Sequence, residues 1–308
     1  DISAKKDGEP CCAYIGPEGS GHYVKMVHNG IEYADMQLIA EAYLVLKHIG
    51  KFNNQKIGKI FEEYQKGELS SFLIRITSEI FQEMDDMSTQ SLVDMIKDSA
   101  QQKGTGRWTN MEALKQGIDV SMIAAAGNAR LMSNKETRKT AEEHYPRIKI
   151  AKIPNHETLI EDVRKSLYAA KIIAYAQGFD LLKQASTAYD WNLPLGKIAS
   201  IFRAGCIIQA KFLNDITRAY EHEKNLSHLL LDEVFEKRVI SYEKALRQIA
   251  AQAMLSGIPV PAMANAISYL DLFTKNHVGA NLIQAQRDYF GAHTFERVDE
   301  EGSFHHEW

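Results

Sequence analysis

The chain has 308 residues, of which 45% are hydrophobic and 25% are charged, and its formal net charge at pH 7 is −4. This composition is typical of a globular protein with one large core or two domains, and the lack of a long basic run argues against nucleic-acid binding. No apolar stretch is long enough to span a membrane, and no signal-peptide pattern is present. Because Cys11, Cys12 and Cys206 show neither metal-ligand spacing nor a disulfide framework, we expect a cytoplasmic protein without a metal.

Residues 1–16 contain one short run, Cys11–Ile15, that predicts a single β-strand. A lone strand is not stable by itself. We therefore expect residues 1–16 to be the remnant of a preceding domain.

A helix is predicted over about 20–48, and it carries one polar stripe. Lys25, His28, Asn29 and Glu32 stand at i, i+3, i+4 and i+7, a spacing that places all four on one helix face. The other faces are mostly apolar, which is typical of a buried helix, and a buried Lys or Glu is costly unless it is paired or used for chemistry. The stripe combines a base, an acid and two hydrogen-bonding groups, as a proton-transfer site requires. The alternative is a solvated strip on an ordinary helix.

Helical periodicity continues along most of the chain, and β-type alternation is almost absent. The predicted helices after the first cover about 56–66, 69–84, 88–101, 112–133, 157–189, 194–203, 206–222, 226–233, 235–256 and 259–275. Glycine, proline and asparagine residues separate them. The predicted fold class is therefore all-α.

The chain also contains an internal repeat. Ala40–Lys47 resembles Ala176–Lys183 at an offset of 136 positions, and Ile57–Ile60 resembles Leu195–Ile198 at an offset of 138. Two copies of a unit, one long helix followed by shorter ones, predict a duplicated helical domain with halves at about 20–133 and 157–275.

A second chemical feature is the turn Lys103-Gly104-Thr105-Gly106. Glycines allow backbone N–H groups to converge, while Lys adds charge and Thr adds a hydroxyl, so the turn suits a phosphate group. Such turns are often only loops, and no Walker spacing is present. The hypothesis of an anion site gains support if Tyr33 and Arg130 face this turn.

The last segment, residues 281–308, leaves the helical rhythm. It is rich in aromatic residues: Tyr289, Phe290, Phe295, Phe304 and Trp308. A free tail rarely carries so many, so we expect this segment to pack on something, with a partner subunit as a good candidate.

Several of these segments together resemble one family. The segment Gly21–Tyr33, G-H-Y-V-K-M-V-H-N-G-I-E-Y, resembles the signature of the 6-phosphogluconate dehydrogenases, the decarboxylating oxidoreductases of the pentose phosphate pathway. The resemblance continues through Lys103–Gly106, Tyr168–Phe179, Gly205–Ile208, Ser256–Pro261 and Gln284–Thr294. It implies the duplicated all-α domain of this family as a substrate and dimerisation domain over 17–280, with a tail over 281–308 that reaches the other subunit of a homodimer.

The same resemblance implies that a dinucleotide-binding domain is missing. No G-x-G-x-x-G follows a predicted strand, so we expect NADP to be bound mainly by the absent domain, with no cofactor-binding residue in this chain. The choice between NADP and NAD is left open. We expect the chain alone to have no dehydrogenase activity.

The family's roles carry over to matching positions as expectations. Lys25 resembles the general base that takes the C3-hydroxyl proton, and Glu32 resembles the acid that protonates C1 after carbon dioxide leaves. The residues that resemble substrate ligands are His28 and Asn29 at the hydroxyls and carboxylate, Tyr33, Lys103, Thr105 and Arg130 at the phosphate, and Arg287 and His293 from the partner subunit.

Two other functions stay open at this point. A relative among the β-hydroxyacid dehydrogenases would share the catalytic Lys but would not need Lys103, Thr105 and Arg130 together. A non-catalytic helical dimerisation module would bind no phosphosugar, and its polar stripe would be accidental.

Overall fold

The computed structural model describes residues 2–146, 148–150 and 155–308. The fold is all-α, as predicted, and divides into two compact units, Asp1–Ile267 and Ser268–Trp308. The boundary lies inside one helix.

The elements of the first unit follow in chain order. They are β1 (Lys5–Lys6), β2 (Glu9–Pro10), α1 (Ser20–His48), α2 (Asn54–Lys66), α3 (Phe72–Ile80), α4 (Leu92–Met95), α5 (Thr105–Gln116), α6 (Ser121–Ser133), α7 (Thr137–His144), α8 (His156–Ala188), α9 (Leu195–Ile201), α10 (Leu213–His222), the 3₁₀ helix η1 (Leu229–Leu231) and α11 (Glu233–Leu255). Helix α12 (Pro261–Thr274) crosses the boundary, and α13 (Ala280–Gly291) belongs to the second unit.

The predicted strand Cys11–Ile15 is wrong. A two-residue hairpin forms instead, in which β1 pairs with β2 in antiparallel register. Its turn is Asp7-Gly8, and both residues have positive φ, 52° and 82°. That is the backbone of a tight hairpin turn, which Asp-Gly adopts readily, so a local turn decided the pairing.

Several helix boundaries also differ from the prediction. The helix expected over 112–133 is two helices, α5 and α6, because Gly117 adopts a left-handed conformation (φ 69°) that ends α5. The helix expected over 88–101 shrinks to the four residues of α4, none of which is buried. So short and exposed a segment lacks the packing that stabilises a helix.

The second half of the chain shows similar corrections. The helix expected from 206 begins only at Leu213, because the preceding Ala210 pairs its backbone with Ser71. The helix expected over 226–233 is reduced to η1, since Asp232 accepts hydrogen bonds from two backbone amides and starts α11 at Glu233. The prediction that residues 281–308 leave the helical rhythm is wrong for α13. Asp288 is its one buried residue among those described, so no apolar stripe marks this helix.

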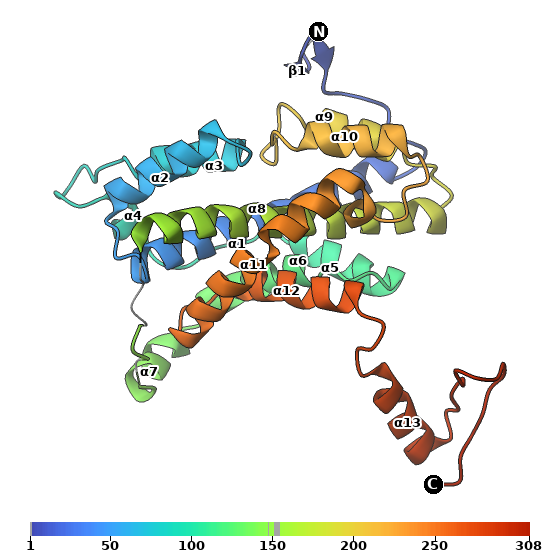
Figure 1. The fold of residues 1–308 in the computed structure, drawn as a ribbon. Helices are drawn as coiled ribbons and strands as arrows, with labels where there is room; N and C mark the ends of the chain where they lie inside the picture. Colours follow the sequence, from blue (N-terminus) through green and yellow to red (C-terminus); the bar gives the residue numbers. More distant parts are fainter. Residues whose placement is uncertain (1, 147, 151–154) are drawn as a thin grey trace. The chain divides into compact units, whose positions relative to one another are not determined.

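The core of the first unit is built on two long helices, α1 and α8, which lie side by side (Figure 1). Asp35 of α1 and Lys171 of α8 stand 136 positions apart, the offset of the internal repeat. Their side chains are 1% and 0% exposed, and the Asp35 Oδ1 and Lys171 Nζ atoms are 2.7 Å apart. Equivalent positions of the two halves therefore meet in a buried ion pair.

A second pair of equivalent residues connects the halves. Glu41 of α1 accepts hydrogen bonds from the backbone amides of Ala262 (2.7 Å) and Met263 (2.8 Å) at the start of α12. Gln177 of α8, again 136 positions later, accepts one from the amide of Met122 (3.1 Å) at the start of α6. Each long helix thus caps a shorter helix from the other half, where unpaired N–H groups need acceptors.

Glu41 predicts a pH dependence of stability. Burial raises the pKa of Glu41 to about 7, although the hydrogen bonds from Met263, Ala262 and Gln37 lower it. The folded state then holds a proton that the unfolded state loses near its ordinary value of 4.5, so this contribution to stability is complete below pH 4.5 and is lost as pH rises through 7. We expect Glu41→Gln to flatten the decline of the free energy of unfolding between pH 5 and 8, by on the order of 2 kcal/mol.

Urea unfolding at several pH values measures this slope. The matched variant is Gln177→Glu, which places a carboxylate at the equivalent cap of the other half and should add a slope of the same sign. An unchanged slope in Glu41→Gln would contradict the assignment.

Candidate functional site

The orientation of α1 is set by two close glycine contacts. Gly30 of α1 lies against Thr109 of α5, where an added Cβ would come within 2.7 Å of the Thr109 methyl carbon. Gly178 of α8 lies against Ile31, where the corresponding distance is 2.5 Å. Since larger residues would push these helices apart, the glycines fix which face of α1 is covered. Thr109 also donates a hydrogen bond to the Met26 carbonyl (2.9 Å).

The polar stripe of α1 forms one connected group. Lys25 Nζ lies 3.1 Å from His28 Nδ1, which lies 3.1 Å from Asn29 Oδ1. The His28 ring is 2% exposed and packs edge-to-face on Phe202, with ring centroids 5.0 Å apart. The expectation of a buried Lys25 is wrong, since its side chain is exposed, and Glu32 is half-buried. The apolar faces of α1 meet other helices, but the face with Lys25 stays open at the start of the helix.

Two groups of the stripe have shifted pKa values. Burial lowers the pKa of His28 to about 4, helped by the positive charge of Lys25, while the hydrogen bond with Asn29 acts the other way. His28 is therefore neutral at pH 7. Burial raises the pKa of Glu32, although Lys25 and Arg130 lower it. A raised pKa is the direction expected of a carboxyl group that must hold a proton before donating it.

The second predicted feature lies beside the stripe. Gly104 has a left-handed backbone (φ 101°) and is the N-cap of α5, so Thr105 is the first helical residue. Gly106 lies so close to the Tyr33 ring that an added Cβ would be 2.6 Å from it. The Arg130 guanidinium lies over the same ring, 3.6 Å from its centroid. The structure therefore brings Tyr33, Arg130 and the glycine turn together, as the sequence analysis required.

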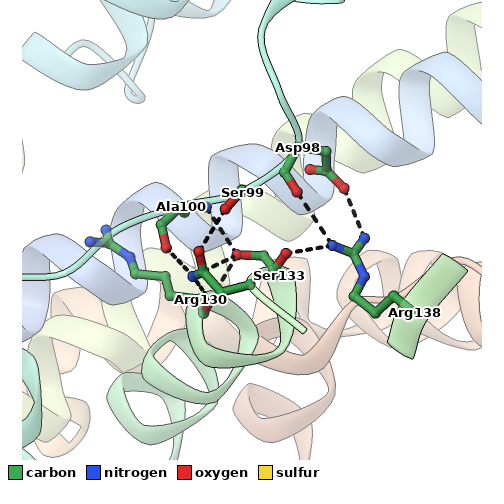
Figure 2. A network of polar contacts seen from close by, with 7 residues as sticks. Asp98, Ser99, Ala100, Arg130, Ser133 and Arg138 are labelled. Atoms are coloured by element: carbon green, nitrogen blue, oxygen red, sulfur yellow. Dashed lines mark hydrogen bonds and ion pairs between the residues drawn. The ribbon is translucent and has the colours of Figure 1, made fainter. Parts of the chain in front are cut away.

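The loop that leads into this turn is attached to the end of α6 (Figure 2). The amide of Ala100 donates to Ser133 Oγ (2.9 Å), and Asn134 Nδ2 donates to the carbonyls of Ala100 and Arg130 (2.7 Å each). The backbone carbonyl of Arg130 accepts the hydrogen bond from Asn134, whereas the Arg130 side chain points away from this network (Figure 2). Its Nη1 atom lies 3.5 Å from the Gln101 carbonyl oxygen. The segment carrying Lys103 is thus held next to Arg130.

Arg287 and His293, the other two predicted ligands, lie in the second unit and are exposed. Arg287 donates to Gln284 Oε1 (3.0 Å), and the His293 ring packs edge-to-face on Phe290.

Asp288, between these two residues, is a feature that the sequence analysis missed. Its fully buried carboxylate accepts hydrogen bonds from the Thr294 amide (3.0 Å), His305 Nδ1 (2.8 Å), the His306 amide (3.1 Å) and Trp308 Nε1 (2.9 Å). Burial opposes ionisation, but these donors hold the pKa of Asp288 below its usual range. One carboxylate therefore folds the end of the chain back onto α13. No sequence pattern marks it, since its partners follow at irregular spacing.

Cys206 is another missed neighbour of the stripe. Burial raises the pKa of its thiol, while the nearby charge of Lys25 lowers it. The segment Gly205–Ile208 was part of the resemblance, which is the one signal that could have placed Cys206 near the stripe.

Across residues 2–146, 148–150 and 155–308, no cluster of three metal-ligating side chains occurs. In the same part of the chain, every helix is too short or too polar to cross a membrane.

Fold and site together define a helical domain of two related halves, with an acid–base stripe next to a cationic helix N-terminus. The family model for "6-phosphogluconate dehydrogenase, C-terminal domain" matches residues 21–308. The chain belongs to this family.

Relatives of known name are similar over the whole chain. The NADP(+)-dependent, decarboxylating 6-phosphogluconate dehydrogenase of Bacillus subtilis is 51% identical over 100% of this chain and 66% of its own length. The decarboxylating enzyme of Lactococcus lactis subsp. lactis is 48% identical over 99% of this chain and 65% of its own length. The chain thus spans somewhat less than two thirds of these relatives.

A solved structure agrees with these relatives. The 6-phosphogluconate dehydrogenase of Plasmodium falciparum, described in apo form and with its cofactor NADP+ or its substrate 6-phosphogluconate, is 45% identical and superposes with a TM-score of 0.97. The superposition covers 99% of this chain and 66% of that one.

Proposed function

We propose that this chain is the substrate-binding and catalytic portion of a 6-phosphogluconate dehydrogenase, which converts 6-phosphogluconate to ribulose 5-phosphate and carbon dioxide in the pentose phosphate pathway. The observation that carries the proposal is the position of Arg130 on Tyr33, next to the N-terminus of α5 and beside the polar stripe. A phosphate end and a reacting end are thus adjacent on α1.

The phosphate end contains Tyr33, Lys103, Thr105 and Arg130. A phosphate ester carries nearly two negative charges at neutral pH. The N–H groups at the start of α5, which no side chain caps, and the Arg130 guanidinium suit such a dianion, because helix N-termini and Arg forks both bind phosphate oxygens. Arg287 and His293 would complete the site from the partner subunit.

The reacting end performs the acid–base steps. Lys25 removes the proton of the C3 hydroxyl as C3 is oxidised to a ketone, and the protonated Lys25 then polarises that ketone. The β-keto acid loses carbon dioxide, and Glu32 protonates C1 of the resulting enediol. His28 and Asn29 orient the hydroxyls and the carboxylate. Since Lys25 is exposed in this chain, closure of the site around the substrate would be needed to exclude water from the reacting end.

The coenzyme is assigned outside these residues. The 308 residues contain no G-x-G-x-x-G turn, which is the turn that holds the pyrophosphate of a dinucleotide. We therefore place NADP binding mainly in the third of the relatives' length that this chain does not span. NADP bound there would supply the hydride acceptor for the oxidation at C3. The three cysteines are free, which suits a reducing compartment, and we place the protein in the cytoplasm.

Calorimetric titration of the 308-residue chain with 6-phosphogluconate tests the proposal. We expect detectable binding of 6-phosphogluconate and none of gluconate, which has the same reacting end but no phosphate. Equal affinity for both compounds would contradict the phosphate site. Binding of neither would favour the non-catalytic dimerisation module.

We further propose a homodimer in which the tail of one subunit serves the site of the other. The second unit exposes large apolar side chains, Leu282 (62%), Ile283 (60%), Tyr289 (70%) and Phe290 (72%), and a patch of this kind marks an interface. We expect sedimentation to show a dimer at micromolar concentration, and Tyr289→Ser with Phe290→Ser to shift it towards the monomer. Met87→Ser, at a 95% exposed position, is the control and should leave the dimer unchanged.

Mixed dimers test the exchange of tails. Arg130→Ala and Arg287→Ala should each weaken binding of 6-phosphogluconate. When the two variants are mixed and allowed to exchange subunits, a fraction of the sites receives Arg130 from one subunit and Arg287 from the other. Recovery of tight binding in that fraction is expected, and its absence would show that each tail serves its own subunit.

A further inference from the structure

The first unit contains a basic cavity that the proposed reaction does not use. Its volume is about 500 Å³, and its lining includes five cationic side chains: Lys6, Lys66, Arg75, Arg203 and Lys211. No acidic residue is among the lining residues. In a chain with a net charge of −4, so many cations around one cavity form a local field that attracts anions.

The backbone at this cavity joins the two halves of the fold. The cavity lies at the isolated bridge between Ser71 and Ala210, where the Phe72 amide donates to the Gln209 carbonyl (3.0 Å) and the Lys211 amide donates to the Ser70 carbonyl (2.8 Å). Helix α3 begins immediately after one side of this bridge, and α10 begins shortly after the other. The N-termini of two helices, one from each half of the fold, therefore lie at the same cavity, and their first N–H groups already donate within the fold, as Ile74 does to Ser71 Oγ and Leu213 to the Ala210 carbonyl.

The surrounding ion pairs leave much of the positive charge available. Arg203, whose side chain is 14% exposed, pairs with Glu9 and is largely buried. Lys6 pairs with Asp7, Lys66 with Glu63 and Arg75 with Glu79, and these three are contacts of exposed or half-exposed groups. Such pairs are weak and exchange readily. Lys211 has no ion-pair partner among the residues that the structure describes.

The cations are divided between the two halves of the fold. Lys66 and Arg75 belong to α2 and α3, whereas Arg203 and Lys211 belong to the segment between α9 and α10. A ligand with a single charged group would contact the cations of one half only. We propose that this cavity binds an oligophosphate, a compound with two or more phosphate groups that span the bridge between the halves.

Calorimetry with inorganic tripolyphosphate tests the proposal. The titration uses the 308-residue chain with Arg130→Ala, so that anion binding at the candidate substrate site is strongly weakened. We expect one bound tripolyphosphate per chain. Lys211→Gln and Arg75→Gln, each added to that background, should weaken binding roughly tenfold or more, because each removes a charge-assisted contact. Lys59→Gln is the matched control, since Lys59 is an exposed lysine of α2 outside the cavity, and it should change the affinity less than twofold.

Three results would overturn the proposal. The first is an equal loss of affinity in Lys59→Gln, which would show an unspecific response to net charge. The second is binding of orthophosphate as tightly as tripolyphosphate, which would remove the argument for a ligand that spans both sides. The third is tighter binding of a hexaglutamate peptide than of tripolyphosphate, which would make the cavity a docking site for an acidic protein segment.

Discussion

Removal of either partner of the Asp35–Lys171 ion pair is expected to lower the free energy of unfolding by about 3–5 kcal/mol. Both side chains are almost completely buried, and their charged atoms are 2.7 Å apart. Asp35→Leu leaves an ammonium group without a partner between α1 and α8, and Lys171→Met leaves a carboxylate. An unpaired buried charge is far more costly than the pair, because water no longer solvates it.

The double variant separates charge from packing. Asp35→Leu combined with Lys171→Met removes both charges, so it should lose much less stability than either single change. Lys237→Met, which breaks the exposed pair with Glu233, is the control and should leave the urea midpoint unchanged. Additive losses in the double variant would contradict the claim that the two charges depend on each other.

Arg130→Ala is expected to weaken binding of 6-phosphogluconate by roughly 100-fold. The guanidinium is held over the Tyr33 ring, and two charge-assisted hydrogen bonds to a phosphate contribute about 1.5–3 kcal/mol each. Arg130→Lys should restore little of the lost affinity, because an ammonium group offers no planar fork to the phosphate and stacks poorly on the Tyr33 ring. Lys25→Ala should change the affinity less than about fivefold, since we propose Lys25 for the reacting end, where contacts tighten only in the transition state.

Calorimetric titration of the three variants measures these affinities. Arg218→Ala, a change of equal charge at a 77% exposed side chain of α10, should bind like the parent chain. If Lys25→Ala abolished binding and Arg130→Ala left it intact, the two ends of the site would be assigned the wrong way round.

Much of this site could be predicted from the sequence because its signals are local. The spacing of Lys25, His28 and Glu32 is a property of any helix of 3.6 residues per turn. The turn at Lys103–Gly106 was predicted because its glycines stand close together in sequence, whereas the left-handed Gly104 and the start of α5 at Thr105 came from the structure. The all-α class followed from the same periodicity repeated along the chain.

The failures of prediction have non-local causes. Lys25 is exposed although its helix is mostly buried, because exposure depends on which faces the other helices cover. Helix α13 was missed because its one buried residue, Asp288, binds the end of the chain through side-chain and backbone donors rather than through an apolar stripe. Strand pairing at the N-terminus depended on a two-residue turn and not on the apolar run that follows it.

The sequence alone therefore determined the helical class, the polar stripe of α1 and the glycine turn, because backbone periodicity and glycine conformation are set within a few residues. Only the tertiary structure decided that Arg130 lies on Tyr33, that Asp35 pairs with Lys171 and that Glu41 caps α12. Each of these contacts joins residues tens to hundreds of positions apart. Such contacts are selected by the packing and desolvation of whole helices, which no local pattern in the chain encodes.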